Sequence, residues 1–153
     1  MALEYTLEFG ADLSAEQTLR TVFPDGAIVR SQRWPGVVEV DLGSLLVVAR
    51  YRPKDELPPP LVEEIFESRF PISVLLRLSK SDASAWGAMI DVVDRFLKTW
   101  PDDAVLLFNG EIVLLHRQAG TLRLNRNASW WQNDQNRARV TTPYEWAEIP
   151  KLE

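Results

Sequence analysis

Few side chains in this sequence are spaced as catalytic or metal-binding groups usually are. His116 is the only histidine, which excludes a His-pair metal site and a Ser-His dyad elsewhere in the chain. Two carboxylate pairs, Asp91 with Asp94 and Asp102 with Asp103, have the residue type for acid-base or Mg²⁺ chemistry. The first pair falls on the polar side of a predicted helix and the second in a turn, whereas His116 ends a predicted strand, where we expect it to have a hydrogen-bond partner. We predict structural roles for all five residues.

The sequence also lacks the short motifs of the large enzyme classes. It has no phosphate loop, no GxGxxG, no GxSxG and no HExxH. It has no Cys, which excludes disulfides, thiol nucleophiles and thiolate-ligated metals and fits a cytoplasmic protein. We therefore predict that the chain is not an enzyme and has no catalytic, cofactor-binding or metal-binding residues. The alternative, an enzyme without a short motif, requires a pocket in which carboxylates or His116 converge.

Acidic side chains gather in one stretch after a proline-rich connection. They are Asp55, Glu56, Glu63, Glu64 and Glu67. The last three fall on the outward side of a short helix predicted over residues 61–68. A run of this kind either meets a basic partner or forms an ordinary solvated helix face. We take these five residues as candidate partner-binding residues.

Arginine and tryptophan alternate near the end of the chain. Trp130 and Trp131 stand among Asn residues and five arginines: Arg117, Arg123, Arg126, Arg137 and Arg139. Because arginine binds phosphate and tryptophan stacks on bases, this set is also the nearest thing to a nucleic-acid surface. The formal net charge of −5 argues against a general polyanion binder. We therefore include Trp130 and Trp131 among the candidate partner-binding residues and treat packing against the fold as their main alternative role.

A predicted β-hairpin over residues 104–117 organises the fold. Asn109-Gly110 separates two apolar runs and suits a two-residue turn with positive φ at both positions, which predicts that Phe108 faces Glu111 and Ala104 faces Leu115. Both faces of this hairpin are apolar, so each needs a cover. The helix predicted over residues 81–100 covers one face. The other is left to the Trp130-Trp131 segment, a second copy of the chain or a partner.

The remaining patterns predict an α+β fold. Alternation and β-prone runs predict strands over residues 3–9, 27–32, 38–42, 45–52, 72–78 and 121–124, with Asp41 facing Leu46 and Glu39 facing Val48. A capping box at Ser14 and Gln17 predicts a helix over residues 14–23. We expect residues 125–139 to be irregular. The expectation is one domain over residues 1–153, with a mainly antiparallel sheet of about six to eight strands and both main helices packed on one face.

No segment predicts export or membrane insertion. No apolar run approaches the ~20 residues that span a bilayer. The start of the chain lacks the basic and apolar regions of a signal peptide. We expect a cytoplasmic protein without a membrane partner.

Several segments resemble a known family. They are the start 1–5, the strand 73–78 followed by an amphipathic helix, the FNGE hairpin within 103–111, and the strand 120–125. Together they are similar to the third immunity family of the bacterial Sit (swarming-inhibition toxin) systems. The resemblance does not extend to residues 127–139. It implies a small non-enzymatic protein that binds and neutralises a cognate toxin delivered between neighbouring cells, and it brings no catalytic residue to this chain.

The functional prediction is an immunity protein that neutralises a protein toxin by stoichiometric occlusion. Carboxylates on such a protein steer a basic toxin, and a few aromatic anchors hold it. A nucleic-acid-binding module that uses the Arg- and Trp-rich segment is the alternative. A homodimer is one further way of covering the second hairpin face.

Overall fold

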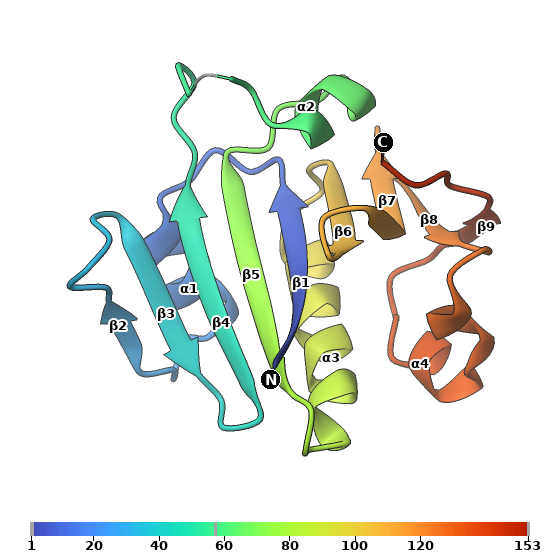
Figure 1. Cartoon of the computed structure of the whole chain (residues 1–153), viewed down its shortest axis with the longest axis horizontal. Coiled ribbons are helices and arrows are strands. Elements are labelled where there is room, and N and C mark those ends of the chain that lie inside the picture. The colour runs from blue at the N-terminus through green and yellow to red at the C-terminus, as the bar shows by residue number, and fades with distance from the viewer. Residues whose placement is uncertain (1, 57, 153) are drawn as a thin grey trace.

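The computed structural model describes residues 2–56 and 58–152, and within them one nine-stranded sheet runs through the molecule (Figure 1). The strands are β1 Ala2–Phe9, β2 Ile28–Arg30, β3 Val37–Asp41, β4 Leu45–Tyr51, β5 Ile72–Ser79, β6 Ala104–Phe108, β7 Ile112–Gln118, β8 Thr121–Asn125 and β9 Glu145–Ala147. The helices are α1 Ala15–Val22, α2 Leu61–Phe66, α3 Ser84–Thr99 and α4 Asp134–Ala138, with a 3₁₀ turn η1 at Ser129–Gln132. Met1, Leu57 and Glu153 of the predicted domain lie outside the described residues.

The strand order is β2-β3-β4-β5-β1-β6-β7-β8-β9. The neighbouring pairs from β2 through β8 are antiparallel, and β9 runs parallel to β8. The α+β class and the mainly antiparallel sheet are confirmed. The sheet has one strand more than the predicted range, because β9 joins its edge. None of the helices in the described residues is long and apolar enough to cross a bilayer.

The two main helices form where local signals predicted them. Ser14 caps α1, since its hydroxyl accepts from Gln17 N while the Gln17 side chain accepts from Ser14 N, which confirms the capping box. Helix α3 begins at Ser84, later than the predicted start at residue 81, and its N-cap residue Ala83 has no side-chain cap bond. The Asp82 carboxylate still accepts from the Ser84 backbone N–H at this end. Figure 1 shows α1 and α3 behind the sheet. The buried apolar residues of both helices belong to one core cluster with alternate residues of the strands.

The hairpin of β6 and β7 keeps its predicted turn but not its predicted pairing. Asn109 and Gly110 have φ of 53° and 74°, and Glu111 N donates to Phe108 O across 3.2 Å. Beyond the turn Phe108 pairs with Ile112, and an irregularity after Leu106 shifts the register again. Ala104 therefore lies opposite Arg117 rather than Leu115.

This shift places Arg117 at the end of helix α3. Its guanidinium donates to Leu97 O (2.6 Å), Trp100 O (2.5 Å) and Asp102 O (2.8 Å). The last carbonyls of a helix have no partner within the helix and carry partial negative charge, which favours a cation there. In the altered register, the buried Arg117 side chain therefore supplies hydrogen-bond donors to carbonyl groups at the end of α3.

The second face of the hairpin has a cover that differs from the predicted one. Val105, Leu107 and Val113 form a separate small core with residues from two distant segments. These residues are Val62, Phe66, Phe70, Ile149 and Leu152. The cover is therefore α2 and the C-terminal segment, and the Trp130-Trp131 segment packs on the side of the sheet that carries α1 and α3.

The segment predicted to be irregular contains two short helical turns, η1 and α4. The chain then returns through β9 and packs along β8. The Asn125 side chain holds this return, because its Nδ2 donates to Val113 O (2.7 Å) and Ile149 O (3.0 Å) and its Oδ1 accepts from Ile149 N (3.1 Å). A single buried amide therefore joins β7, β8 and the C-terminal segment.

Candidate partner-binding surface

The predicted acidic residues separate into two groups. Glu56 lies beside two arginines, with its carboxylate 3.2 Å from Arg50 Nη1 and 3.0 Å from Arg52 Nε. Glu63 accepts a 2.6 Å hydrogen bond from Phe70 N. These two carboxylates stabilise the connection between β4 and β5. The other three, Asp55, Glu64 and Glu67, are exposed and have no side-chain partner among the described residues.

Helix α2 has two apolar sides with different environments. Val62 and Phe66 face the hairpin and belong to its small core. Leu61 and Ile65 point away from it and are 48% and 43% exposed. Helix α2 therefore buries one apolar side against the fold. It also exposes apolar side chains to solvent next to Glu64.

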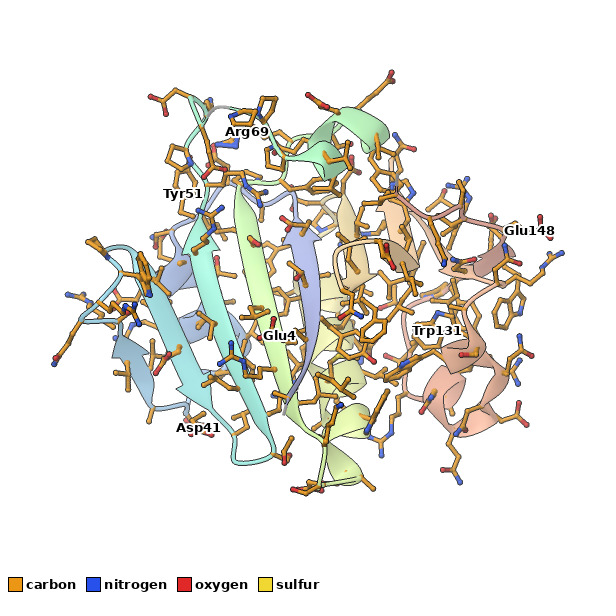
Figure 2. All side chains as sticks on the ribbon, viewed as in Figure 1. Glu4, Asp41, Tyr51, Arg69, Trp131 and Glu148 are labelled. Carbon is orange, nitrogen blue, oxygen red and sulfur yellow. The ribbon has the colours of Figure 1, made fainter. Side chains whose placement is uncertain are left out.

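Trp130 and Trp131 are mostly used by the fold. Trp131 is 1% exposed, and its Nε1 donates to Leu114 O across 2.7 Å (Figure 2). Trp130 packs on Trp86, with 4.8 Å between ring centroids, and its Nε1 donates to the Tyr5 hydroxyl across 3.0 Å. Burial raises the pKa of Tyr5 to about 12 against the opposing effect of this bond. Trp131 cannot stack on a nucleic-acid base without leaving the core.

The arginines of the same segment are also partly engaged. Arg139 Nη1 lies 2.8 Å from Asp91 Oδ2, and Arg137 forms an ion pair with Asp134. Arg117 is buried at the end of α3. The arginines and tryptophans therefore do not assemble into one exposed basic and aromatic surface.

The predicted structural role of Asp94 is confirmed, but its predicted position on a solvated helix face is wrong. Asp94 is 5% exposed, and it accepts hydrogen bonds from the backbone N–H and the hydroxyl of both Thr141 and Thr142. Burial by itself raises the pKa of this carboxyl, but the threonine bonds and Lys98 together hold it below its ordinary value. Asp94 thus fixes the C-terminal segment to α3.

His116 lacks the hydrogen-bond partner that its position led us to expect. Its Nε2 is buried without a partner among the described residues, and its ring packs on Phe66 of α2 with 4.3 Å between centroids. Burial lowers the pKa of His116, which favours the neutral imidazole. Among residues 2–56 and 58–152, no three His, Asp or Glu side chains converge as metal ligands do.

A buried ion pair that the sequence did not reveal joins β1 to the connection after β4. Arg52 Nη1 donates to Glu8 Oε2 (2.9 Å) and to Phe70 O (3.0 Å), and both side chains of the ion pair are 6% exposed. Ser73 Oγ donates to Glu8 Oε1 across 3.1 Å. This network holds the segment that carries Glu56 and α2 against the top of the sheet.

Five strands leave their second face open. Figure 1 shows β2, β3, β4, β5 and β1 without a helix in front of them. The strand pairing places the outward side chains of this surface, called the open face below, in three rows. These rows are Asp41-Leu46-Arg77-Glu4, then Val29-Glu39-Val48-Leu75-Thr6, then Val37-Arg50-Ser73-Glu8. At the end of the third row Glu8 is covered by Arg52. Figure 2 shows Glu4 over the middle of the sheet and Asp41 at a lower end of it.

A groove crosses the open face beneath the β2–β3 loop. It has a volume of about 470 Å³ and is lined by Thr6, Trp34, Val37, Val48, Ser73 and Leu75 among others. We call it the Trp34 groove. Trp34 is 58% exposed, the most exposed of the large apolar side chains in the described residues. A second cavity of about 750 Å³ lies on the other side of the same loop, toward the start of α1.

Comparison with known proteins places this fold in a family. The SitI3-like family model matches residues 3–135, which is most of the chain. The chain belongs to the SitI3-like family. No curated protein and no solved structure matches it. The match reaches Trp130 and Trp131, further than the resemblance found in the sequence, and ends before β9.

SitI3-like proteins form an immunity family, and such proteins are typically non-enzymatic. Membership implies a cognate toxin as partner. In this SitI3-like protein the open face, the Trp34 groove and helix α2 all lie within the matched residues.

Sequence reasoning missed the open face of this SitI3-like protein for a specific reason. The pairing of β3 with β4 was predicted correctly, with Asp41 opposite Leu46 and Glu39 opposite Val48. The order of β4, β5 and β1 depends on contacts between distant segments. The exposed Trp34 between two short strands was the one local signal that pointed to this surface.

Proposed function

We propose that this chain is an immunity protein that binds its cognate toxin in a stoichiometric complex and blocks the toxin by occlusion. The complex forms in the cytoplasm of the cell that makes the immunity protein and protects that cell. Membership of the SitI3-like family, over residues 3–135, is the observation that carries this proposal.

The distribution of charge supports binding to a basic protein. The formal net charge is −5, and Asp55, Glu64 and Glu67 carry exposed carboxylates without a side-chain partner among the described residues. Unpaired surface charges raise the association rate with an oppositely charged protein and are screened by salt. These three residues therefore favour the encounter with a basic toxin.

Co-expression tests the function directly. A bacterial strain that expresses the toxin encoded beside this gene should stop growing, and co-expression of this chain should restore growth. The purified chain should bind the inactivated toxin at a ratio of one to one by isothermal titration calorimetry. The proposal fails if the chain gives neither protection nor a complex.

Charge reversal tests the encounter. A triple variant carries Lys at Asp55, Glu64 and Glu67, and a matched control carries Lys at Asp25, Glu111 and Glu148, which are also exposed. Both variants change the net charge by the same amount. The first should lower the association rate constant in stopped-flow measurements by about tenfold at low salt, and the control by much less. Equal effects of the two variants would show that only total charge matters.

A further inference from the structure

The Trp34 groove has the features of a preformed anchoring site. Three hydrogen bonds hold the loop over it: Trp34 N donates to Ser31 Oγ (3.0 Å), Val37 N donates to Trp34 O (3.2 Å) and Ser31 N donates to Val37 O (2.8 Å). Gly36 has a φ of +77°, a conformation that glycine adopts at little cost. The Trp34 side chain is therefore exposed on a loop that is already ordered. Tryptophan is often one of the few residues that contribute most of the binding free energy of an interface. On an ordered loop, little conformational entropy of the loop is lost when a partner covers the side chain.

The floor of the groove is mainly aliphatic and half-buried. Thr6, Leu75 and Val48 lie side by side in the middle row of the open face, on three neighbouring strands. Their side chains are half-buried in the free chain. The groove thus offers two aliphatic floor residues, the Thr6 side chain beside them and an aromatic wall, with Arg50 and Ser73 at its edge. The aliphatic and aromatic part suits one large apolar side chain of a partner.

The charges around the groove predict the sign of the charge that a partner carries next to it. Arg77 donates to Glu4 across 2.7 Å, and Arg50 lies 3.2 Å from Glu56, so both arginines of the open face already have a carboxylate. Glu39 lies in the same row as Val48 and has no partner among the described residues, and Asp41 bonds only the backbone N–H of Gly43. Glu39 and Asp41 are two residues apart on β3 and point to the same face. On the loop, Arg33 stacks on the Trp34 ring, with 5.2 Å between its guanidinium carbon and the ring centroid. Among the described residues on the strands of the open face, the charges without an oppositely charged partner are the carboxylates of Glu39 and Asp41.

We propose that the toxin docks on the open face, with a large apolar side chain in the Trp34 groove and a lysine or arginine beside Glu39 and Asp41. This inference rests on the proposed function and names its binding surface. The acidic residues from 55 to 67 border the upper end of this surface, since Glu56 is paired with Arg50. They contribute to the encounter, whereas Trp34 and Glu39 determine how long the complex lasts.

The experiment compares two variants of the open face with two matched variants of α2. Trp34→Ala and Glu39→Lys change the open face. Ile65→Ala and Glu64→Lys make equivalent changes at exposed apolar and acidic residues of α2. Binding of each purified full-length chain to the inactivated neighbouring toxin is measured by surface plasmon resonance. Each open-face variant should raise the dissociation rate constant at least tenfold, and each α2 variant should change it less than threefold.

Several results would overturn this docking surface. If the wild-type chain binds and both open-face variants dissociate as slowly as the wild type, the proposed function stands and the docking surface is wrong. If Ile65→Ala and Glu64→Lys have the larger effects, the toxin binds α2 instead. If light scattering shows a dimer that Trp34→Ala converts to a monomer, a second copy of the chain occupies the groove. If the wild-type chain does not bind the toxin, both the proposed function and its docking surface fail.

Hydrogen exchange of the complex gives a measurement without substitutions. The toxin should protect the backbone amides of residues 31–37, which form the wall of the groove. Protection confined to residues 61–67 would contradict the proposal. Circular dichroism and urea denaturation should show the wild-type fold in all four variants, because each substituted side chain is exposed or half-buried.

Discussion

The buried ion pair of Glu8 and Arg52 gives a quantitative test of how the α2 segment is held. Removal of one partner of a buried pair costs about 3–5 kcal/mol because the other charge stays buried without compensation. Arg52 keeps Glu56 at 3.0 Å and Phe70 O at 3.0 Å when Glu8 is removed. Glu8 keeps only the Ser73 hydroxyl when Arg52 is removed. We expect Glu8→Leu to cost about 3 kcal/mol and Arg52→Met about 4 kcal/mol.

The double variant separates coupling from simple loss of contacts. Apolar replacement of both members of a buried pair is often close to neutral, so we expect Glu8→Leu with Arg52→Met to lie within about 2 kcal/mol of the wild type. If the two sites were independent, the double variant would instead lose about 7 kcal/mol, the sum of the two single effects. The difference between the coupled and the independent outcome is a large fraction of a typical free energy of unfolding, which is about 5–15 kcal/mol.

Urea denaturation provides the assay, monitored by tryptophan fluorescence and by far-ultraviolet circular dichroism. With a slope of about 2 kcal/mol per molar urea, a 3 kcal/mol loss lowers the midpoint by about 1.5 M. The Glu4–Arg77 pair on the same sheet is a matched control, because both of its side chains are 48% exposed. Its coupling energy should be below about 1 kcal/mol. Additive effects at Glu8 and Arg52, or equal coupling energies in the two pairs, would show that Glu8 and Arg52 do not act as a coupled buried pair.

Two further predictions concern His116 and Asn125. The pKa of His116 in the folded chain lies below its ordinary value of 6.5, so the unfolded chain binds more protons as the pH falls. Its contribution to stability is therefore complete above pH 6.5 and is lost as the pH falls through 6.5 toward the folded pKa. His116→Gln should reduce the loss of stability between pH 7.5 and pH 5 in urea titrations, and an unchanged loss would contradict this. Asn125→Leu leaves the Val113 and Ile149 backbone groups without their partner and should cost about 2–4 kcal/mol, with faster hydrogen exchange at Ile149. Exposed Asn127→Leu is its control and should cost less than about 0.5 kcal/mol, and equal costs would argue against the role of Asn125.

Signals within a few residues of each other determined much of the local structure. Ser14 and Gln17 predicted the start of α1, and Asn109-Gly110 predicted the turn between β6 and β7. The alternation in the two neighbouring segments 38–42 and 45–52 predicted the pairing of β3 with β4. In each case the deciding hydrogen bonds join near neighbours, so the sequence contains both partners in one window.

The roles of charged side chains were less predictable because they depend on distant partners. Asp94 has the spacing of a solvated helix residue, yet it is buried by Thr141 and Thr142, which follow it by nearly fifty residues. Glu63 belongs to an acidic run, yet it binds Phe70 N. The type of a charged residue does not reveal whether a later segment will cover it.

Local patterns in the sequence predicted the class of fold, its main helices and most of its strands, and the family comparison confirms the resemblance seen in the sequence. Which elements cover each face of the sheet became known from the folded structure alone. The second hairpin face is closed by α2, Phe70 and Leu152, whereas β2, β3, β4, β5 and β1 keep one side open beneath Trp34. The physical reason is that hydrophobic burial is non-directional: an apolar pattern requires a cover but does not specify which segment provides it. The choice depends on strand order and on long-range hydrogen bonds such as those of Glu8 and Asn125.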